Sequence, residues 1–300
     1  MTGSGGPVDG TWEVQEADGV VLVQDAGRPG HAHLGVPRSG WLDPAAARAA
    51  LRLVGDPDDA ALLEVALGGL ALRATDDRWV ALTGTARDVR VDGRAAAYGR
   101  AVRVPAGAVL SLGPPRAGVR SWLAIGGGVT VPPVLGSRST DTLSGLGPAR
   151  LRTGDLLPLG EPAAPGVEEP PYVVGGAARA GGAGHGAPVE LRVDPGPRLD
   201  RLALEAWARL TTTVWTAAAG DRVGVRLDGP ALEHAETSEL ASEGLVLGAV
   251  QVPPDGRPLV FLADHPTTGG YPVAAVVRAA DLGGCAQLRP GDPVRFVAGR

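Results

Sequence analysis

The sequence predicts a mainly β protein with a few short helices, folded as two β-barrel-like lobes. Short β-branched and aliphatic runs recur along the 300 residues, separated by Gly, Pro and Asp, at intervals typical of antiparallel barrels or sandwiches. A turn followed by a strand recurs at 105–112, 153–159 and 290–296, which favours two similar lobes. A Pro-, Gly- and Ala-rich stretch over residues 161–186 has little hydrophobic periodicity. The predicted division is an N-terminal β lobe (1–160), a linker or mobile loop (161–186) and a C-terminal β lobe (187–300).

The first predicted elements of the N-terminal lobe are a strand, a long loop and a short helix. Residues 20–23 are a β-branched and aliphatic run that indicates a buried strand. Asp43 is expected to cap a helix over residues 45–54, and Gly55 is expected to end it. Further strands are expected at 61–67, 70–74, 79–83, 89–91, 101–104, 109–112 and 119–125.

The C-terminal lobe is predicted to contain one helix among strands. The helix is amphipathic and lies near residues 199–210. The strands are expected at 189–193, 222–227, 245–252, 259–263, 273–277 and 294–297. A hydrophobic content of 44% is ample for buried cores in both lobes.

Composition excludes several classes of protein. A net charge of −5 and a pI near 5.6 argue against a nucleic-acid surface, which needs clustered basic residues. No apolar stretch approaches the length that crosses a bilayer, and the first twenty residues lack the regions of a signal peptide. The expectation is a cytoplasmic protein with no nucleic-acid or membrane partner.

The basic residues and the single cysteine narrow the chemistry further. All 28 basic residues are arginine, so the chain has no P-loop lysine, Schiff-base lysine or biotinyl-lysine. Cys285 alone excludes an internal disulfide and multi-cysteine metal sites, and it is expected to be a small buried hydrophobe.

The loop at residues 24–43 is the first candidate site. Its glycines and prolines shape a strand-to-helix crossing that displays Asp25, Arg28, Ser39 and Asp43. The Arg28 guanidinium and the start of the following helix both favour an anion. The alternative is that Asp25 and Arg28 pair with each other and the glycines only turn the chain.

Two later loops carry comparable groups. Residues 136–141 place Ser137, Thr140 and Asp141 after a glycine, which suits a carboxylate, phosphate or amide ligand, or a hydrogen-bonded turn that Asp141 caps. Residues 264–272 begin with Asp264 and His265, either of which can serve as an acid or base or belong to a structural loop.

The end of the third loop offers groups that hold negative charge. Thr267 and Thr268 precede a Gly pair, where hydroxyls and backbone amides can bind an oxyanion or a carboxylate, and Tyr271 follows. His31 and His33 lack a third ligand nearby, so no metal site is predicted.

The ordered set of these segments resembles the 5-oxoprolinase C subunit family, also called allophanate hydrolase subunit 2 or KipA-like, and the carboxyltransferase part of urea carboxylase. The resemblance runs from about Gly19 to Phe296. The segments that carry it are Gln24-Asp25-x-Gly27-Arg28-x-Gly30, Gly35-x-x-x-Ser39-Gly40-x-x-Asp43, Leu53-Val54-Gly55, Leu82-Thr83-Gly84, Gly126-Gly127, Gly136-Ser137-x-Ser139-Thr140-Asp141, Val250-Gln251-Val252-Pro253 and Thr267-Thr268-Gly269-Gly270-Tyr271-Pro272.

This resemblance implies a cyclophilin-like architecture and a partner similar to the 5-oxoprolinase B subunit. With that partner and a third subunit, the A subunit, such proteins are implied to open 5-oxo-L-proline to L-glutamate with ATP and Mg. Two further roles remain open: the carboxyltransferase subunit of a biotin-dependent urea or amide carboxylase, and a KipA-type regulator that binds its B subunit homologue. Biotin, if used, arrives on another chain.

Some positions depart from the family pattern. Leu51 and Asp56 stand where Asn is usual, and the segment 221–227 places Asp221 and Val225 where Asn and Tyr are common. Either group lost at 221 or 225 is a candidate for lining the site, so the departures bear on the substrate.

The site hypothesis joins all three loops. Asp25, Arg28 and Asp43 are expected to be catalytic: Arg28, with the Thr267 and Thr268 amides, holds negative charge, and Asp25 or Asp43 orients the substrate or accepts a proton. The expected substrate-binding residues are Ser39, Ser137, Thr140, Thr267, Thr268 and Tyr271.

Overall fold

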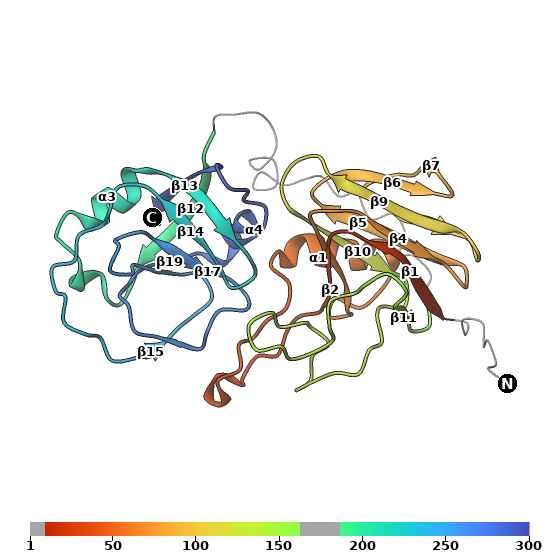
Figure 1. Ribbon diagram of the computed structural model, residues 1–300, viewed down its shortest axis with the longest axis horizontal. Coiled ribbons are helices and arrows are strands. Elements are labelled where there is room, and N and C mark those ends of the chain that lie inside the picture. The colour runs from red at the N-terminus through yellow and green to blue at the C-terminus, as the bar shows by residue number, and fades with distance from the viewer. Residues whose placement is uncertain (1–9, 163–186, 300) are drawn as a thin grey trace. The chain divides into compact units, whose positions relative to one another are not determined.

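The computed structural model describes residues 10–162 and 187–299 (Figure 1). Within these ranges the fold is mainly β with three short α-helices, as the sequence predicts. The chain forms two compact units, one from residues 10–27, 44–140 and 145–162 and the other from 28–43, 141–144 and 187–299. The predicted linker at 161–186 lies, apart from its first two residues, outside the described residues.

The first unit contains two open sheets and one helix. The first sheet has the order β11-β1-β4-β9-β6-β7, and the second β2-β3-β10-β5-β8. The strands are β1 (Thr11–Ala17), β2 (Val20–Gln24), β3 (Leu62–Ala66), β4 (Leu70–Arg73), β5 (Arg78–Gly84), β6 (Arg87–Val91), β7 (Arg94–Ala95), β8 (Val102–Val104), β9 (Val109–Pro115), β10 (Arg120–Ile125) and β11 (Leu156–Pro158).

One hydrophobic core joins the two sheets of this unit. Trp12 and Leu72 of the first sheet belong to the same buried cluster as Val23, Leu63 and Leu123 of the second. Helix α1 (Pro44–Val54) contacts β5 and β10. Strand β10 is buried along its whole length, because residues on both faces of a strand are covered when a sheet lies between two layers.

The prediction of a barrel in this unit is wrong. Strands β2 and β8 end their sheet without pairing with each other, and β11 and β7 end the other sheet, so neither sheet closes in the described residues. The apolar alternation that suggests a barrel is equally satisfied when two open sheets cover each other. Sequence periodicity indicates which face of a strand is buried, but it does not distinguish a closed barrel from two open sheets packed face to face.

A buried arginine organises the backbone of the first unit. Arg87 in β6 is 4% exposed, and its guanidinium donates to the carbonyls of Val65 (2.8 Å), Leu67 (2.7 Å) and Gly113 (3.0 Å). Its Nε donates to the Ser121 hydroxyl at 2.8 Å. The planar fork of arginine therefore satisfies several backbone acceptors at once.

Replacement of Arg87 by lysine tests this role. The ammonium keeps the charge but has three donors at one point, so we expect Arg87→Lys to leave buried carbonyls unpaired and to lower the free energy of unfolding by about 2 kcal/mol. Urea unfolding measures the loss. Arg90→Lys is the matched control, because Arg90 lies on the same strand and is exposed. Equal stabilities of the two variants would contradict the assignment.

The second unit is built on a closed seven-stranded barrel with the order β12-β19-β16-β17-β14-β13-β20. In β12, Val189, Leu191 and Val193 are buried and alternate with exposed residues, as expected for a strand with one face in a barrel interior. The barrel strands are β12 (Val189–Pro195), β13 (Val214–Gly220), β14 (Gly224–Asp228), β16 (Ala249–Gln251), β17 (Leu259–Phe261), β19 (Val273–Val277) and β20 (Pro293–Ala298).

Short elements accompany the barrel. They are the paired strands β15 (Glu243–Gly244) and β18 (Thr268–Gly269), the helices α3 (Ala206–Thr212) and α4 (Leu282–Cys285), and the 3-10 turns Ala32–Leu34, Leu199–Arg201 and Ala279–Asp281. The predicted helix near 199–210 is interrupted, because Leu202 is extended and bridges His234, and Ala203 N donates to Glu233 O at 2.8 Å.

The predicted strand 245–252 is shorter than expected, because only Ala249–Gln251 form the strand β16. Gly248 has φ +85°, a left-handed conformation that ends strand geometry before Ala249. A Cβ at Gly248 would lie 2.8 Å from Val277 O, so the position requires glycine. Residues 245–247 consequently leave the barrel wall and line a cavity described below.

Candidate functional site

A cavity of about 410 Å³ lies in the second unit, between segments that are far apart in the sequence. The loop 28–43 contributes Arg28, Val36 and Arg38, the segment 245–247 contributes apolar side chains, and the third loop contributes His265 and Thr267. Ligand cavities in proteins are typically apolar with a few placed polar groups. The cavity has this composition, with the guanidinium groups of Arg28 and Arg38, the imidazoles of His31 and His265 and the Thr267 hydroxyl among apolar neighbours.

The loop 28–43 is folded by its own backbone. Arg28 N donates to Arg38 O at 2.6 Å, which closes the segment between them. Within it, Leu34 N and Val36 N both donate to His31 O, at 2.9 and 3.3 Å. These bonds bring Arg28 and Arg38 to one cavity although ten positions of sequence separate them.

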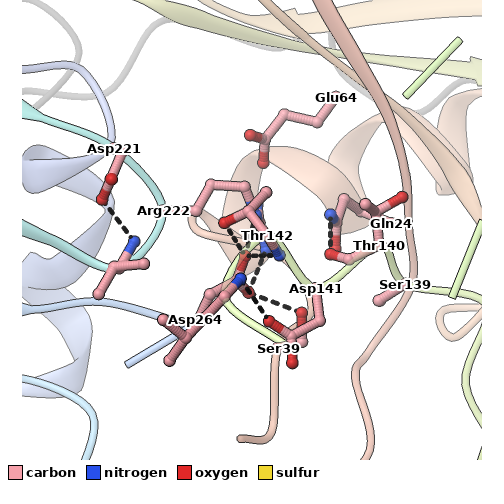
Figure 2. Close-up of polar contacts among 12 residues, drawn as sticks. Gln24, Ser39, Glu64, Ser139, Thr140, Asp141, Thr142, Asp221, Arg222 and Asp264 are labelled. Atoms are coloured by element: carbon pink, nitrogen blue, oxygen red, sulfur yellow. Dashed lines mark hydrogen bonds and ion pairs between the residues drawn. The ribbon is translucent and has the colours of Figure 1, made fainter. Parts of the chain in front are cut away.

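Asp264 is the centre of a buried polar cluster in the same unit. It is fully buried, and its Oδ2 accepts from Arg222 Nε (3.0 Å), Thr142 N (2.9 Å) and Thr142 Oγ1 (2.7 Å). Its Oδ1 accepts from Ser39 Oγ at 2.6 Å and Arg222 Nη2 at 3.2 Å. Figure 2 shows Ser39, Thr142 and Arg222 pointing toward this carboxylate. Every lone pair of Asp264 thus accepts a hydrogen bond, and the carboxylate joins the loop 28–43, Thr142 and Arg222.

The pairing of Arg222 with Asp264 follows from the barrel register. Strands β14 and β17 are antiparallel neighbours, with Gly224 opposite Phe261. Just beyond their ends, Asp264 N donates to Arg222 O at 2.9 Å. Arg222 Nη2 also donates to Gly40 O at 2.5 Å, so the ion pair fixes the loop 28–43 on the barrel.

The charge state of Asp264 is set by these contacts. Burial disfavours the carboxylate, but the Arg222 charge and the hydrogen bonds from Arg222, Ser39 and Thr142 outweigh it and hold the pKa of Asp264 below its ordinary value. Asp264 is therefore ionised at neutral pH and is engaged on all sides. Of the two acid–base candidates in the third loop, it is the structural one.

Ser39 connects the loop to the barrel under backbone strain. It is 2% exposed, has φ +54°, and donates through its hydroxyl to Asp264 while Ser39 N donates to Ala263 O at 3.1 Å. A left-handed conformation is unfavourable for residues with a Cβ. The two hydrogen bonds maintain it.

A pair of substitutions separates the hydrogen bond of Ser39 from its strain. Ser39→Ala loses the charge-assisted bond and keeps the strain, so we expect the free energy of unfolding to fall by about 2 kcal/mol. Ser39→Gly loses the same bond but relieves the left-handed backbone, so its loss should be smaller. Urea unfolding of both variants measures the difference, and a larger loss for Ser39→Gly would contradict the assignment.

His265 differs from Asp264 in that it lines the cavity. The residue is 6% exposed, and its Nδ1 lies 2.7 Å from Pro266 O. Burial, together with the nearby charge of Arg38, lowers the pKa of His265 against the opposing effects of Pro266 O and Asp264. The ring is therefore neutral at neutral pH.

Asp25 belongs to the first unit, where it joins two of the predicted loops. Its Oδ1 accepts from Gly27 N (2.8 Å), Ser137 Oγ (2.5 Å) and Ser139 Oγ (2.6 Å), and its Oδ2 accepts from Arg138 N at 2.5 Å. Ser139 Oγ accepts in turn from Asp25 N at 2.9 Å. These contacts give Asp25 and Ser137 a role in fixing backbone.

The remaining predicted residues lie in different surroundings. In the first unit Thr140 Oγ1 donates to Pro148 O at 2.8 Å. In the second unit Thr267 lines the cavity with Arg28, whereas Tyr271 lines another cavity, of about 270 Å³, with Arg201 and His234. Thr268 is exposed in β18. The Asp43 carboxylate lies against Gly283, where a Cβ would come within 2.9 Å of Asp43 Cγ.

Two residues of the Asp264 cluster were not among the predicted site residues. Arg222 and Thr142 are 42 and 122 positions from Asp264, and nothing in their local sequence signals the contact. Asp221 folds onto its own turn, accepting from Val223 N and Gly224 N, and Val225 is buried in the barrel. Positions 221 and 225, two of those that depart from the family pattern, therefore do not line the 410 Å³ cavity.

Other chemistry is limited in the described part of the chain. It contains no group of three or more His, Cys, Asp or Glu residues placed to hold a metal ion. Burial raises the pKa of the Cys285 thiol to about 12, so the predicted buried cysteine is protonated and unreactive. None of its helices has the length and apolar character required to traverse a bilayer.

Comparison with known proteins places the chain among carboxyltransferase domains. Residues 34–298 match the family described as carboxyltransferase domain, subdomain A and B. The 5-oxoprolinase C subunit from Escherichia coli (strain K12) is 38% identical over 287 residues, which cover 92% of this chain and 87% of that protein.

Solved structures agree with the sequence comparison. The crystal structure of TTHA0988 superimposes with a TM-score of 0.84 at 38% identity, over 97% of this chain and 56% of that one. The urea amidolyase of K. lactis gives a TM-score of 0.86 at 29% identity, over 99% of this chain and 19% of that one. The chain therefore spans about half of the first solved chain and a fifth of the second.

Proposed function

This chain belongs to the carboxyltransferase domain family, subdomain A and B, and on that premise we propose that it is the C subunit of an ATP-dependent 5-oxoprolinase. Together with the A and B subunits, it opens 5-oxo-L-proline to L-glutamate. The similarity to the 5-oxoprolinase C subunit over 92% of the chain supports this assignment. The cyclophilin-like architecture that the resemblance implies remains part of the proposal.

The observation that carries the proposal is the cavity shared by Arg28 and Thr267. These residues come from two separate segments on which the family resemblance rests. 5-Oxoproline combines a carboxylate with a cyclic amide, and a guanidinium fork matches a carboxylate in geometry and charge. We assign Arg28 to the substrate carboxylate and Thr267, with the adjacent Thr268 amide, to the amide carbonyl.

The remaining predicted residues complete the assignment. Ser39 fixes the loop that carries Arg28, and Asp43 remains the candidate in this unit for orienting the substrate or accepting a proton. Asp25, Ser137 and Thr140 order the loops of the first unit. Tyr271 lines the separate cavity of about 270 Å³ and receives no role in this assignment. ATP and Mg act in the complex. The chain has no lysine, so biotin would have to arrive on another chain.

The test is reconstitution with the A and B subunits. Phosphate release is measured with ATP, Mg and either 5-oxo-L-proline, urea with a biotinylated carrier and bicarbonate, or neither. We expect release that depends on 5-oxoproline and on the presence of this chain. Release that requires the biotinylated carrier and urea would contradict the proposal.

A second candidate is the carboxyltransferase subunit of a urea or amide carboxylase. The fold similarity to urea amidolyase over 99% of this chain favours it. The urea reaction in the same experiment identifies this activity. Tight binding to the B subunit with no turnover of any substrate would instead identify a KipA-type regulator.

A further inference from the structure

The orientation of the His265 ring determines which nitrogen it offers to the cavity. Its Nδ1 lies 2.7 Å from Pro266 O, and a carbonyl oxygen only accepts, so Nδ1 carries the proton. In a neutral imidazole the other nitrogen then bears a lone pair. His265 is therefore held in the tautomer in which Nε2 is a proton acceptor.

In the described part of the chain, no group forms a hydrogen bond with His265 Nε2. Besides the bond to Pro266 O, the ring has a tilted contact with Phe261, with centroids 6.2 Å apart. The side chain is only 6% exposed, and it lines the cavity. An acceptor at the wall of a cavity is available to a ligand that brings an N–H or O–H group.

The charged groups around His265 favour an anionic ligand with a neutral imidazole beside it. Arg38 disfavours protonation of the ring, and Arg28 and Arg38 both line the cavity. Asp264 is the acidic neighbour, but its carboxylate is engaged by Arg222, Ser39 and Thr142. A carboxylate-bearing ligand satisfies the guanidinium groups, and its N–H satisfies Nε2.

We propose that His265 is a catalytic residue of this cavity and that its Nε2 accepts the amide proton of a small cyclic amide carrying a carboxylate. The inference rests on the proposed function and gives the proton-accepting role to His265 rather than to Asp43. As the amide oxygen bonds to the γ-phosphorus of ATP, the bond to ADP breaks. In the same step the N–H bond breaks, its electron pair forms the C=N bond, and its proton moves to Nε2. The products are ADP, imidazolium and a cyclic imidate phosphate.

Two variants of His265 distinguish the roles of its two ring nitrogens. Asn places an amide near Nδ1, so His265→Asn keeps a donor to Pro266 O and lacks Nε2. We expect it to fold normally and to lower kcat of the reconstituted complex about 100-fold or more, in the range of general base catalysis. His265→Gln places an amide near Nε2. We expect its KM to lie near the wild-type value, while its kcat stays as low as that of His265→Asn.

The pH profile and a matched control complete the test. The wild-type rate should fall on the acid side with an apparent pKa below 6.5, the ordinary value of histidine, and both His265 variants should lose this limb. His234→Gln is the control, because His234 Nε2 already lies 3.0 Å from Pro253 O. It should keep both the rate and the limb.

The outcomes distinguish a failure of the role of His265 from a failure of the proposed function. If the wild-type complex turns over 5-oxoproline and His265→Asn retains its kcat and acid limb, the inference is wrong and the function stands. If the wild-type complex does not turn over 5-oxoproline, the proposed function is wrong and this role of His265 falls with it.

Discussion

Asp264→Asn is expected to lower the free energy of unfolding by about 3–5 kcal/mol, because it leaves the Arg222 charge buried without its carboxylate. The Arg222 side chain is 3% exposed and that of Asp264 is fully buried. An Asn also cannot accept from Arg222, Ser39 and Thr142 at once. Urea unfolding monitored by circular dichroism measures the loss.

The matched control is an exposed ion pair on the same barrel. Asp255 and Arg226 lie 2.9 Å apart with side chains 48% and 44% exposed, and such pairs contribute about 1 kcal/mol or less. Asp255→Asn should therefore have little effect. If Asp264→Asn is as stable as Asp255→Asn, the cluster does not hold the barrel and the loop 28–43 together.

The same pair predicts how stability depends on pH. The pKa of Asp264 is lowered in the folded protein, so the unfolded state binds its proton more readily. The stabilisation is fully present above the unfolded pKa of about 3.9 and is lost as pH falls through the folded value. Asp264→Asn should flatten this part of the stability profile relative to Asp255→Asn.

Arg28→Ala is expected to reduce kcat/KM for 5-oxoproline about 100-fold. Arg28 is 1% exposed and lines the cavity, so a substrate carboxylate bound there would lose a desolvated guanidinium partner. Arg28→Lys retains the charge without the fork and should show an intermediate loss. Phosphate release by the reconstituted complex measures both.

Two controls guard the interpretation of Arg28. Arg226→Ala removes an arginine on the barrel that does not line the cavity and should leave the rate unchanged. Circular dichroism and co-purification with the B subunit show whether Arg28→Ala still folds and assembles. A folded, assembled Arg28→Ala complex with the wild-type kcat/KM would remove Arg28 from the substrate site.

Much of the fold is predictable from local sequence pattern. Strands such as β2 and β19 combine β-branched runs with flanking Gly or Pro, and α1 begins with Pro44 and ends before Gly55, which has φ +83°. Strand β1 was missed although Trp12 and Val14 alternate with less buried residues. Its alternation breaks after Val14, where two polar residues, Gln15 and Glu16, follow each other at a β-bulge.

The closure of sheets and the partners of polar groups depend on non-local contacts. One strand pattern gives a barrel in the second unit and two open sheets in the first, because closure depends on which distant edges pair. The sequence likewise identifies Asp264 and His265 as acid–base candidates without distinguishing them. Arg222, across the barrel register, engages one, and Pro266 O fixes the tautomer of the other.

The most direct test of the proposed function is the conversion of ¹³C-labelled 5-oxo-L-proline by the A and B subunits, followed by NMR with and without this chain. We predict that L-glutamate forms only when this chain is present, with ADP produced alongside it. Glutamate formation at the same rate in its absence, or none in its presence while the three proteins assemble, would contradict the proposed function.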